Sequence, residues 1–438
     1  MMQNAENHHQ GTIQKKNGSG RGGNPSRASG GVARHAAKDG GNSQNASKAV
    51  SRQNATGQKV SSACPAALKC GGCIQPGVDY PETLEKKRSR LQHLLKGLCP
   101  VNRVIGMKDP YHYRCKVNAA FAYRNGKVIS GVYAEGTHRV IPTDSCLIED
   151  STADAVIRTI RELIPPFKIH IYQEDTGEGL LRHVQVRVGK YTGQVMVVLV
   201  TASPVFPSRS AFVRQLREAH PEITTIVLNV NDADTSMVLG RRNITLYGPG
   251  YIEDTLCGKT FRISPSSFYQ VNPAQTQLLY TRAISYAGLT GKEKVIDAYC
   301  GTGTIGIAAA RLAGEVTGVE LNENAVKDAV INAQRNDIRN IRFVQQDAGA
   351  YLQQLAAQGE HADVVFMDPP RSGSSRAFLQ ALIKLSPSRV VYISCGPDSL
   401  ARDLQFLKSQ GYIARQCQPF DLFAWTEHVE CVVLLSRA

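Results

Sequence analysis

Hydrophobic and polar positions follow two different patterns along this chain. Between about residue 64 and residue 260, apolar residues mostly recur at every second position, as in AAFAYRNGKVISGVYA, where Asn125-Gly126 separates two alternating runs. Such alternation around an Asn-Gly pair predicts a β-hairpin with a tight turn. Helical spacing of apolar residues occurs in Pro81–Leu98 and Arg209–His220. We therefore expect an α+β domain in the middle of the chain, over residues 63–260.

After residue 261 the pattern changes. Short apolar runs such as KVIDAYC, EVTGVEL, ADVVFMDPP and RVVYISC alternate with helical segments such as NAVKDAVINAQRN. This alternation predicts βαβ units around a parallel sheet, and the final VECVVLLSRA predicts a closing strand. The predicted fold class is therefore α/β, with a Rossmann-like C-terminal domain over residues 261–438.

The start of the chain has a third character. Its first sixty residues contain no aromatic residue, and their nine lysines and arginines against two acidic residues give a net charge of +7. Such a segment buries too little apolar surface to offset its ordering entropy, so residues 1–62 are predicted to be a disordered basic tail. Two interpretations stay open, an electrostatic arm for RNA and a dispensable tail. The net charge of the whole chain is +14, and about half of it lies in the tail. Such a basic protein fits a polyanionic partner.

Location and redox setting follow from what the sequence does not contain. No apolar run is long enough to span a membrane, and the start lacks a signal-peptide core, so a cytoplasmic protein without a membrane partner is expected. No obligate protein partner is evident. In that reducing setting the eleven cysteines favour metal ligation or catalysis over disulfides.

The stretch VIDAYCGTGTIGI combines a predicted strand, a glycine-rich turn and a helix. Gly301 and Gly303 allow a ligand to approach the backbone, and Glu320 at the end of the next strand is placed to accept hydrogen bonds from ribose hydroxyls. Asp297 precedes the glycines and would repel a pyrophosphate, so we expect S-adenosylmethionine rather than NAD. Asp347, after the third strand, either accepts from the adenine amine or is a solvated strand-end acid.

A cysteine, Cys395, stands between the strand RVVYIS and the predicted helix PDSLARDL. Free cysteines are usually small buried apolar residues, but a helix N-terminus favours a thiolate. Methyl transfer to an exocyclic amine needs no thiolate, whereas adding one to carbon 6 of uracil makes carbon 5 nucleophilic. Glu430, at the head of the last strand, is the candidate base that removes the carbon 5 proton. His428 is a second candidate, although a structural histidine is the commoner interpretation.

Five motifs occur together, in order: SSFYQVNPAQ, DAYCGTGTIGI, MDPPRSG, SCGPDSLARDL and HVECVVLL. With them the chain, from about residue 64 to its end, resembles the RNA uracil-C5 methyltransferases. The resemblance implies that Cys395 is the nucleophile and Glu430 the base, acting on a uridine flipped out of its RNA stack. It also implies that the cofactor is contacted by Gln270, Tyr299, Glu320 and Asp368.

The segment CPAALKCGGC supplies Cys64, Cys70 and Cys73, and Cys146 is the candidate fourth member. Their spacing suits an iron–sulfur cluster or zinc. Ribosomal-RNA members of the family resemble the chain here, which implies a [4Fe–4S] cluster on these four cysteines. It further implies that the substrate is a single-stranded or looped region of 23S ribosomal RNA.

The sequence departs from the family in three places. The polar tail stands where many members have an OB-like RNA-binding domain, Ala424 replaces a usual proline, and Cys115 replaces a common asparagine. Three alternatives remain. They are a tRNA uracil-C5 methyltransferase, an amino-methyltransferase that uses the motif Asp368-Pro369-Pro370-Arg371, and a non-catalytic iron–sulfur RNA-binding protein.

Overall fold

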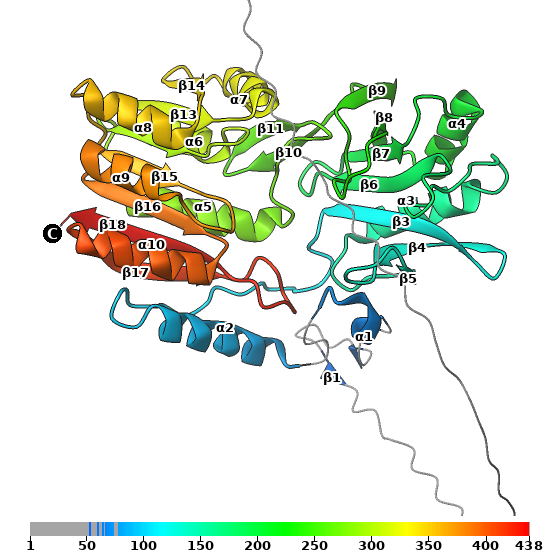
Figure 1. Cartoon of the computed structure of the whole chain (residues 1–438), viewed down its shortest axis with the longest axis horizontal. Coiled ribbons are helices and arrows are strands. Elements are labelled where there is room, and N and C mark those ends of the chain that lie inside the picture. The colour runs from blue at the N-terminus through cyan, green and yellow to red at the C-terminus, as the bar shows by residue number, and fades with distance from the viewer. Residues whose placement is uncertain (1–51, 54–58, 61–63, 65, 74–77, 438) are drawn as a thin grey trace, which may run out of the picture. The chain divides into compact units, whose positions relative to one another are not determined.

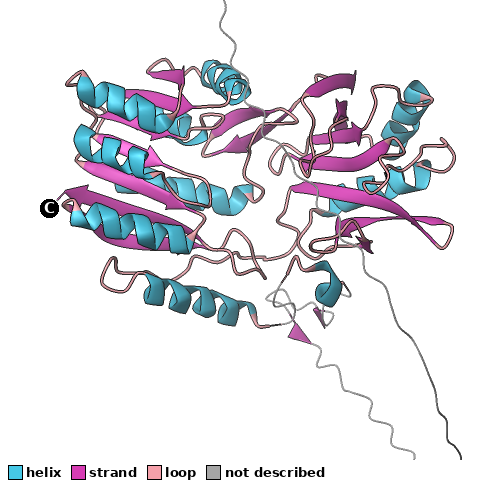
Figure 2. Ribbon diagram, viewed as in Figure 1, coloured by secondary structure: helices cyan, strands magenta, loops and turns pink. Residues whose placement is uncertain are grey.

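The structure is a computed structural model that describes residues 52–53, 59–60, 64, 66–73 and 78–437. The predicted basic tail, residues 1–62, lies outside this part, apart from the short strands β1 (Arg52–Gln53) and β2 (Lys59–Val60). Most of the described chain forms two seven-stranded sheets and a separate two-stranded hairpin. Figures 1 and 2 show how strands and helices alternate within this part. Within the described ranges no helix is both long and apolar enough to cross a membrane.

The C-terminal sheet has the strand order β14-β13-β12-β15-β16-β18-β17. Its first five members are parallel, while β18 runs antiparallel to both β16 and β17. Successive strands are added on one side of β12, as β13 and β14, and then on its other side, as β15 and β16. Ligands of such sheets bind beyond the carboxyl ends of the strands at this switch point. The α/β fold with a Rossmann-like sheet is thereby confirmed. The strands are β12 (Lys294–Ala298), β13 (Glu315–Glu320), β14 (Ile341–Gln345), β15 (Val364–Met367), β16 (Arg389–Ser394), β17 (Tyr412–Phe420) and β18 (Glu430–Arg437).

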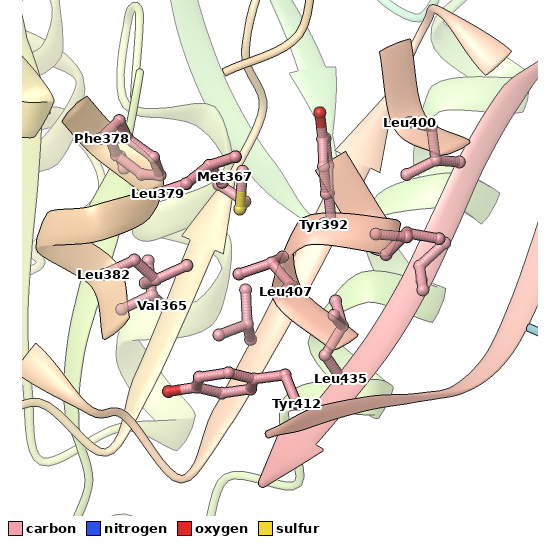
Figure 3. Close-up of a cluster of buried hydrophobic side chains, with 14 of the residues drawn as sticks. Val365, Met367, Phe378, Leu379, Leu382, Tyr392, Leu400, Leu407, Tyr412 and Leu435 are labelled. Carbon is pink, nitrogen blue, oxygen red and sulfur yellow. The ribbon is translucent and has the colours of Figure 1, made fainter. Parts of the chain in front are cut away.

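Helices cover both faces of this sheet. One face packs against α8 (Ala348–Ala357), α9 (Arg376–Leu385) and α10 (Pro397–Ser409). The other packs against α5 (Pro273–Ala287), α6 (Thr304–Ala309) and α7 (Glu323–Arg335), with the short 3-10 turn η1 (Ala310–Leu312) after α6. Figure 3 shows the first of these cores, where strand residues meet helix residues such as Phe378, Leu382 and Leu407.

The second sheet has the order β5-β4-β3-β6-β7-β8-β9 and is antiparallel except between β7 and β8. Helices α3 (Ser151–Leu163) and α4 (Arg209–Ala219) pack into its core, and α4 connects the parallel pair. Asn125 and Gly126 have φ values of 51° and 72°, which confirms the tight turn predicted between β3 and β4. The strands are β3 (Lys116–Arg124), β4 (Lys127–Tyr133), β5 (Val140–Pro142), β6 (Leu181–Val188), β7 (Val195–Thr201), β8 (Ile223–Val230) and β9 (Arg242–Tyr247).

The two sheets share apolar core. Met196 and Val198 of β7 belong to the same buried cluster as Val295 of β12, together with the hairpin of β10 (Ile252–Leu256) and β11 (Lys259–Ile263). The domain division at residues 260 and 261 falls inside β11 and stays a prediction.

A segment from early in the chain also joins the C-terminal sheet. Helix α2 (Tyr80–Leu94), which follows the short helix α1 (Ala67–Cys70), contributes Leu91 to the core of Figure 3. Val101 and Ile105 then form isolated bridges with β17. Residues about three hundred positions apart in the sequence therefore support one sheet.

Candidate active site

Three chemically capable side chains meet where β15 and β16 end and β18 begins. Ser394, the last residue of β16, pairs with Cys431 in an antiparallel register. The next residue of that segment, Cys395, therefore comes opposite Glu430, the first residue of β18. Asp368 directly follows β15, the other neighbour of β16. The fold alone thus brings a thiol and two carboxyl groups to one edge of the sheet.

Burial and mutual repulsion set the proton affinity of these groups. Burial raises the pKa of Glu430 to about 8, with a further contribution from Asp368 and an opposing one from Arg371. Burial likewise raises the pKa of Asp368 to about 7. The pKa of Cys395 rises to about 11 because of burial first, and then because of Glu430 and Asp368, against the effect of Arg371. These four groups form one electrostatic unit.

The raised pKa of Cys395 corrects one expectation. The sequence pattern favours a thiolate stabilised at the start of α10, but desolvation and two neighbouring carboxylates outweigh that stabilisation. Ionisation of the thiol is therefore coupled to the protonation state of Glu430 and Asp368.

Arg371 also contacts His428, and its Nη2 donates to Nδ1 of the imidazole at 2.7 Å. Burial and the positive charges of Arg371 and Lys87 lower the pKa of His428. The histidine is thus held neutral with Nδ1 as the acceptor. Its role as a second base stays a prediction.

The glycine-rich turn lies beside Glu320, whose carboxylate accepts hydrogen bonds from the backbone nitrogens of Gly301 at 3.0 Å and Asn322 at 2.8 Å. Gly303 has a φ of 80°, and a Cβ there would lie 2.9 Å from the Phe343 ring. Glycine is therefore required at residue 303 on two grounds, conformation and space. These contacts hold an acidic side chain against an open turn.

Asp297 provides the clearest sign of a polar ligand. Its Oδ2 accepts from the Gly306 nitrogen at 2.7 Å, but the buried Oδ1 has no partner among the described residues. Burial raises its pKa to about 7, with contributions from Asp368 and Glu320. A buried oxygen of this kind calls for a donor. The turn fits a phosphate-free ligand with ammonium and hydroxyl donors, such as S-adenosylmethionine.

The other predicted cofactor residues have distinct environments. Tyr299 has a φ of 62°, and its ring lies 5.1 Å from that of Phe378. Gln270 lies near the buried Tyr280 and opposes the rise of the Tyr280 pKa. Asp347 is exposed and accepts from the Ala350 nitrogen at 2.9 Å as the N-cap of α8. Its carboxylate is therefore partly committed to a helix cap.

Tyr280 was not predicted from the sequence. It is fully buried on α5, and the charges of Asp368 and Asp297 contribute to raising its pKa. Its hydroxyl therefore lies within the electrostatic influence of both carboxyl groups. A tyrosine within the apolar stripe of a helix gives no sequence signal that separates it from an ordinary core residue.

The four cysteines predicted to bind a cluster fall into two small apolar groups. Cys64 and Cys70 pack near Ala134 and Ile141, whereas Cys73 and Cys146 pack near Trp425 and other residues. Burial, Cys70 and Cys64 together raise the pKa of Cys73 to about 11. Among the residues that the structure describes, no three His, Cys, Asp or Glu side chains are arranged to hold a metal ion. Cys73 thus lies near Cys64 and Cys70 and shares an apolar group with Cys146, but the described thiols do not form a closed ligand set.

Comparison with known proteins gives a consistent result. Residues 79–438 match the sequence model of a family described as tRNA (Uracil-5-)-methyltransferase. An uncharacterised RNA methyltransferase of Halalkalibacterium halodurans is 41% identical over 387 residues, which cover 87% of this chain and 84% of the relative. One from Oceanobacillus iheyensis is 40% identical over 84% of this chain and 82% of its own length.

A solved structure is similar over both sheets. It is the Pyrococcus abyssi tRNA (uracil-54, C5)-methyltransferase in complex with S-adenosyl-L-homocysteine. Its TM-score is 0.69 with 26% sequence identity, covering 82% of this chain and 84% of that chain.

The raised pKa of Glu430 predicts a pH-dependent stability. The folded state keeps this proton up to about pH 8, whereas the unfolded chain loses it near 4.5, so stability falls as pH rises between these values. Glu430→Gln removes that contribution. Between about pH 5 and about pH 8, the unfolding free energy of the wild type should fall by at least about 1 kcal/mol more than that of the variant. Urea titration at both pH values measures this.

The exposed Glu427 supplies the matched control, because Glu427→Gln should follow the wild type at both pH values. Parallel pH profiles for the wild type and Glu430→Gln would contradict the assignment of a high pKa to Glu430.

Proposed function

Since the chain belongs to the family of S-adenosylmethionine-dependent RNA uracil-C5 methyltransferases, we propose that it methylates carbon 5 of a uridine with Cys395 as nucleophile and Glu430 as base. The observation that carries this proposal is the register of β16 and β18, which brings the thiol opposite the carboxyl group. An amino-methyltransferase would need Asp368 but neither of those groups.

The proposed reaction begins with the Cys395 thiolate, whose sulfur forms a bond to carbon 6 of the uracil. The electrons of the carbon 5–carbon 6 double bond move to give an enolate. S-adenosylmethionine supplies an electrophilic methyl group, and carbon 5 bonds to it while the carbon–sulfur bonding pair leaves with S-adenosylhomocysteine. Glu430 then takes the proton from carbon 5. The electrons of that bond restore the double bond and expel the Cys395 thiolate.

The electrostatics of the site suit these steps. A base with a pKa of about 8 is close to the operating pH, where proton abstraction and release are both accessible. Arg371 favours the ionised forms of both Cys395 and Glu430. We therefore assign Arg371 a supporting electrostatic role. Tyr299, Glu320 and Gln270 are proposed to hold the cofactor, with Asp368 between cofactor and base, and Asp347 is proposed as a contact of the adenine amine.

For the substrate we propose 23S ribosomal RNA. Support comes from the set of Cys64, Cys70, Cys73 and Cys146, which is typical of ribosomal-RNA members of the family. The alternative is tRNA, which is the substrate class of the similar Pyrococcus abyssi enzyme. The cysteines are themselves proposed to bind a [4Fe–4S] cluster, supported by their spacing and by the interaction among three of the thiols. Methyl transfer requires no electron from such a cluster.

Substitution of the two catalytic residues should have opposite effects on covalent intermediates. Cys395→Ala should reduce methylation by about a thousandfold or more and form no covalent complex with RNA. Glu430→Gln should permit addition and methyl transfer but stall before elimination. Denaturing gels with methyl-labelled cofactor would then show labelled protein–RNA adduct for this variant alone. Retained activity in Cys395→Ala would favour an amino-methyltransferase instead.

Substrate choice can be read from RNA of a strain that lacks the enzyme. We expect 5-methyluridine to disappear from 23S ribosomal RNA and to persist in tRNA. Mass mapping of both RNA classes measures this, and complementation with the wild type but not with Cys395→Ala should restore the modification. Loss of 5-methyluridine from tRNA alone would favour the alternative substrate.

The proposed cluster predicts iron in the purified protein. Anaerobic preparation should yield about four iron atoms per chain and visible charge-transfer absorption. Cys70→Ala should lose both signals, whereas Cys257→Ala, which alters a cysteine outside the set, should keep them. Zinc in place of iron, or no metal in the wild type, would contradict the cluster.

A further inference from the structure

The connection between β17 and β18, residues 421–429, leads directly into Glu430 and has no helix or strand of its own. It is nevertheless held closely by side chains from three distant parts of the chain. These bind three successive backbone carbonyls. Asn272 Nδ2 donates to Leu422 at 3.1 Å, Lys87 Nζ to Phe423 at 3.0 Å, and the Tyr113 hydroxyl to Ala424 at 3.2 Å.

The first residue of this connection, Asp421, is fully buried. Its Oδ1 accepts from Lys87 Nζ at 2.6 Å, and its Oδ2 accepts from the Tyr80 hydroxyl, also at 2.6 Å. Lys87 is itself only 5% exposed, and the Met107 nitrogen donates to the Tyr80 hydroxyl at 2.8 Å. We call Asp421, Lys87 and Tyr80 the Asp421 clamp. It joins α2 to the start of the connection.

A buried ion pair of this kind is poor evidence for a purely stabilising role. The cost of desolvating both charges is comparable to their attraction, and an apolar pair of similar volume often serves stability equally well. What a fully hydrogen-bonded pair does provide is a defined geometry. Asp421 lies nine residues before Glu430, so the geometry that the Asp421 clamp defines is the path of the connection leading into Glu430.

Backbone strain in the same connection supports this view. Trp425 has a φ of 67°, which is unusual for a residue with a side chain. Its ring lies 5.4 Å from the Tyr80 ring and 5.7 Å from the Tyr111 ring, and its Nε1 donates to the Pro110 carbonyl at 3.3 Å. Strained residues persist where their surroundings over-determine them, and they cluster at functional sites.

We propose that the Asp421 clamp positions Glu430 for removal of the carbon 5 proton, an inference that rests on the proposed role of Glu430. A base acts only within hydrogen-bonding reach of the proton, and a displacement of about 1 Å costs about a hundredfold in rate. Cys395 directly follows β16, and its only described link to the connection is indirect, through Arg371 and His428. Loosening the Asp421 clamp therefore slows the last step and spares the first two.

The test uses Lys87→Met and Tyr80→Phe in the full chain, with Lys86→Met as the matched control. Lys86 is on the same helix, but its charge is exposed and paired with Glu82. In single-turnover reactions, methyl transfer from labelled cofactor to the RNA should stay within about twofold of the wild type. Release of free methylated RNA should slow by about tenfold to a hundredfold, with a denaturation-resistant adduct accumulating. Lys86→Met should match the wild type in both steps.

Two results would overturn the proposal. One is wild-type release of product by both clamp variants. The other is an equal loss of methyl transfer and release that follows the drop in melting temperature, which would make the Asp421 clamp merely structural. Tyr80→Phe removes a single hydroxyl and serves if Lys87→Met does not fold. If Glu430→Gln forms no adduct, the proposed function is contradicted. If Glu430→Gln forms the adduct but the clamp variants release product normally, only the role of the Asp421 clamp is contradicted.

Discussion

The antiparallel pairing of β18 with β16 is the constraint on which the site depends. Ser394 pairs with Cys431, and the apolar residues behind them, such as Ile393 and Val432, are buried. A slip of one residue would move every side chain of β18 to the opposite face of the sheet, so that residues fitted to one core would face the other and Glu430 would turn away from Cys395. The same packing that stabilises the sheet therefore fixes the distance between a thiol and a carboxyl group. Function here follows from strand register.

Burial at this edge creates a site in which several acids hold protons near neutral pH. The pKa values of Asp297, Asp368 and Glu430 are all raised, chiefly by desolvation, and Asp368 also repels the other two carboxyl groups. Arg371 opposes that repulsion at Glu430 and Cys395. A cationic ligand at the same edge would favour the ionised acids in the same way. The protonation states of these acids therefore depend on the charge of the bound ligand.

Much of this arrangement is predictable from the sequence, because strand ends, glycine turns and short motifs are local signals. The sequence pattern predicts that Asp297, Glu320, Asp368, Cys395 and Glu430 lie at or near the ends of strands at one edge of the sheet. It could not give the pKa of Cys395, since desolvation depends on every neighbour rather than on the following helix. The contact of Lys87 with Asp421 and the burial of Tyr280 near Asp297 and Asp368 are likewise outside the reach of a local pattern. Lys87 and Asp421 are 334 positions apart, and nothing in a local pattern relates such residues.

The most direct test of the central claim is to find which atom of the protein becomes attached to the RNA. Carbon 5 of 5-fluorouridine carries fluorine, which a base cannot remove as a proton, so the methylated intermediate should remain bound to the enzyme. Tandem mass spectrometry of peptides from that complex should place the methylated nucleotide on Cys395. Attachment to another cysteine, or methyl transfer without any attachment, would contradict the account.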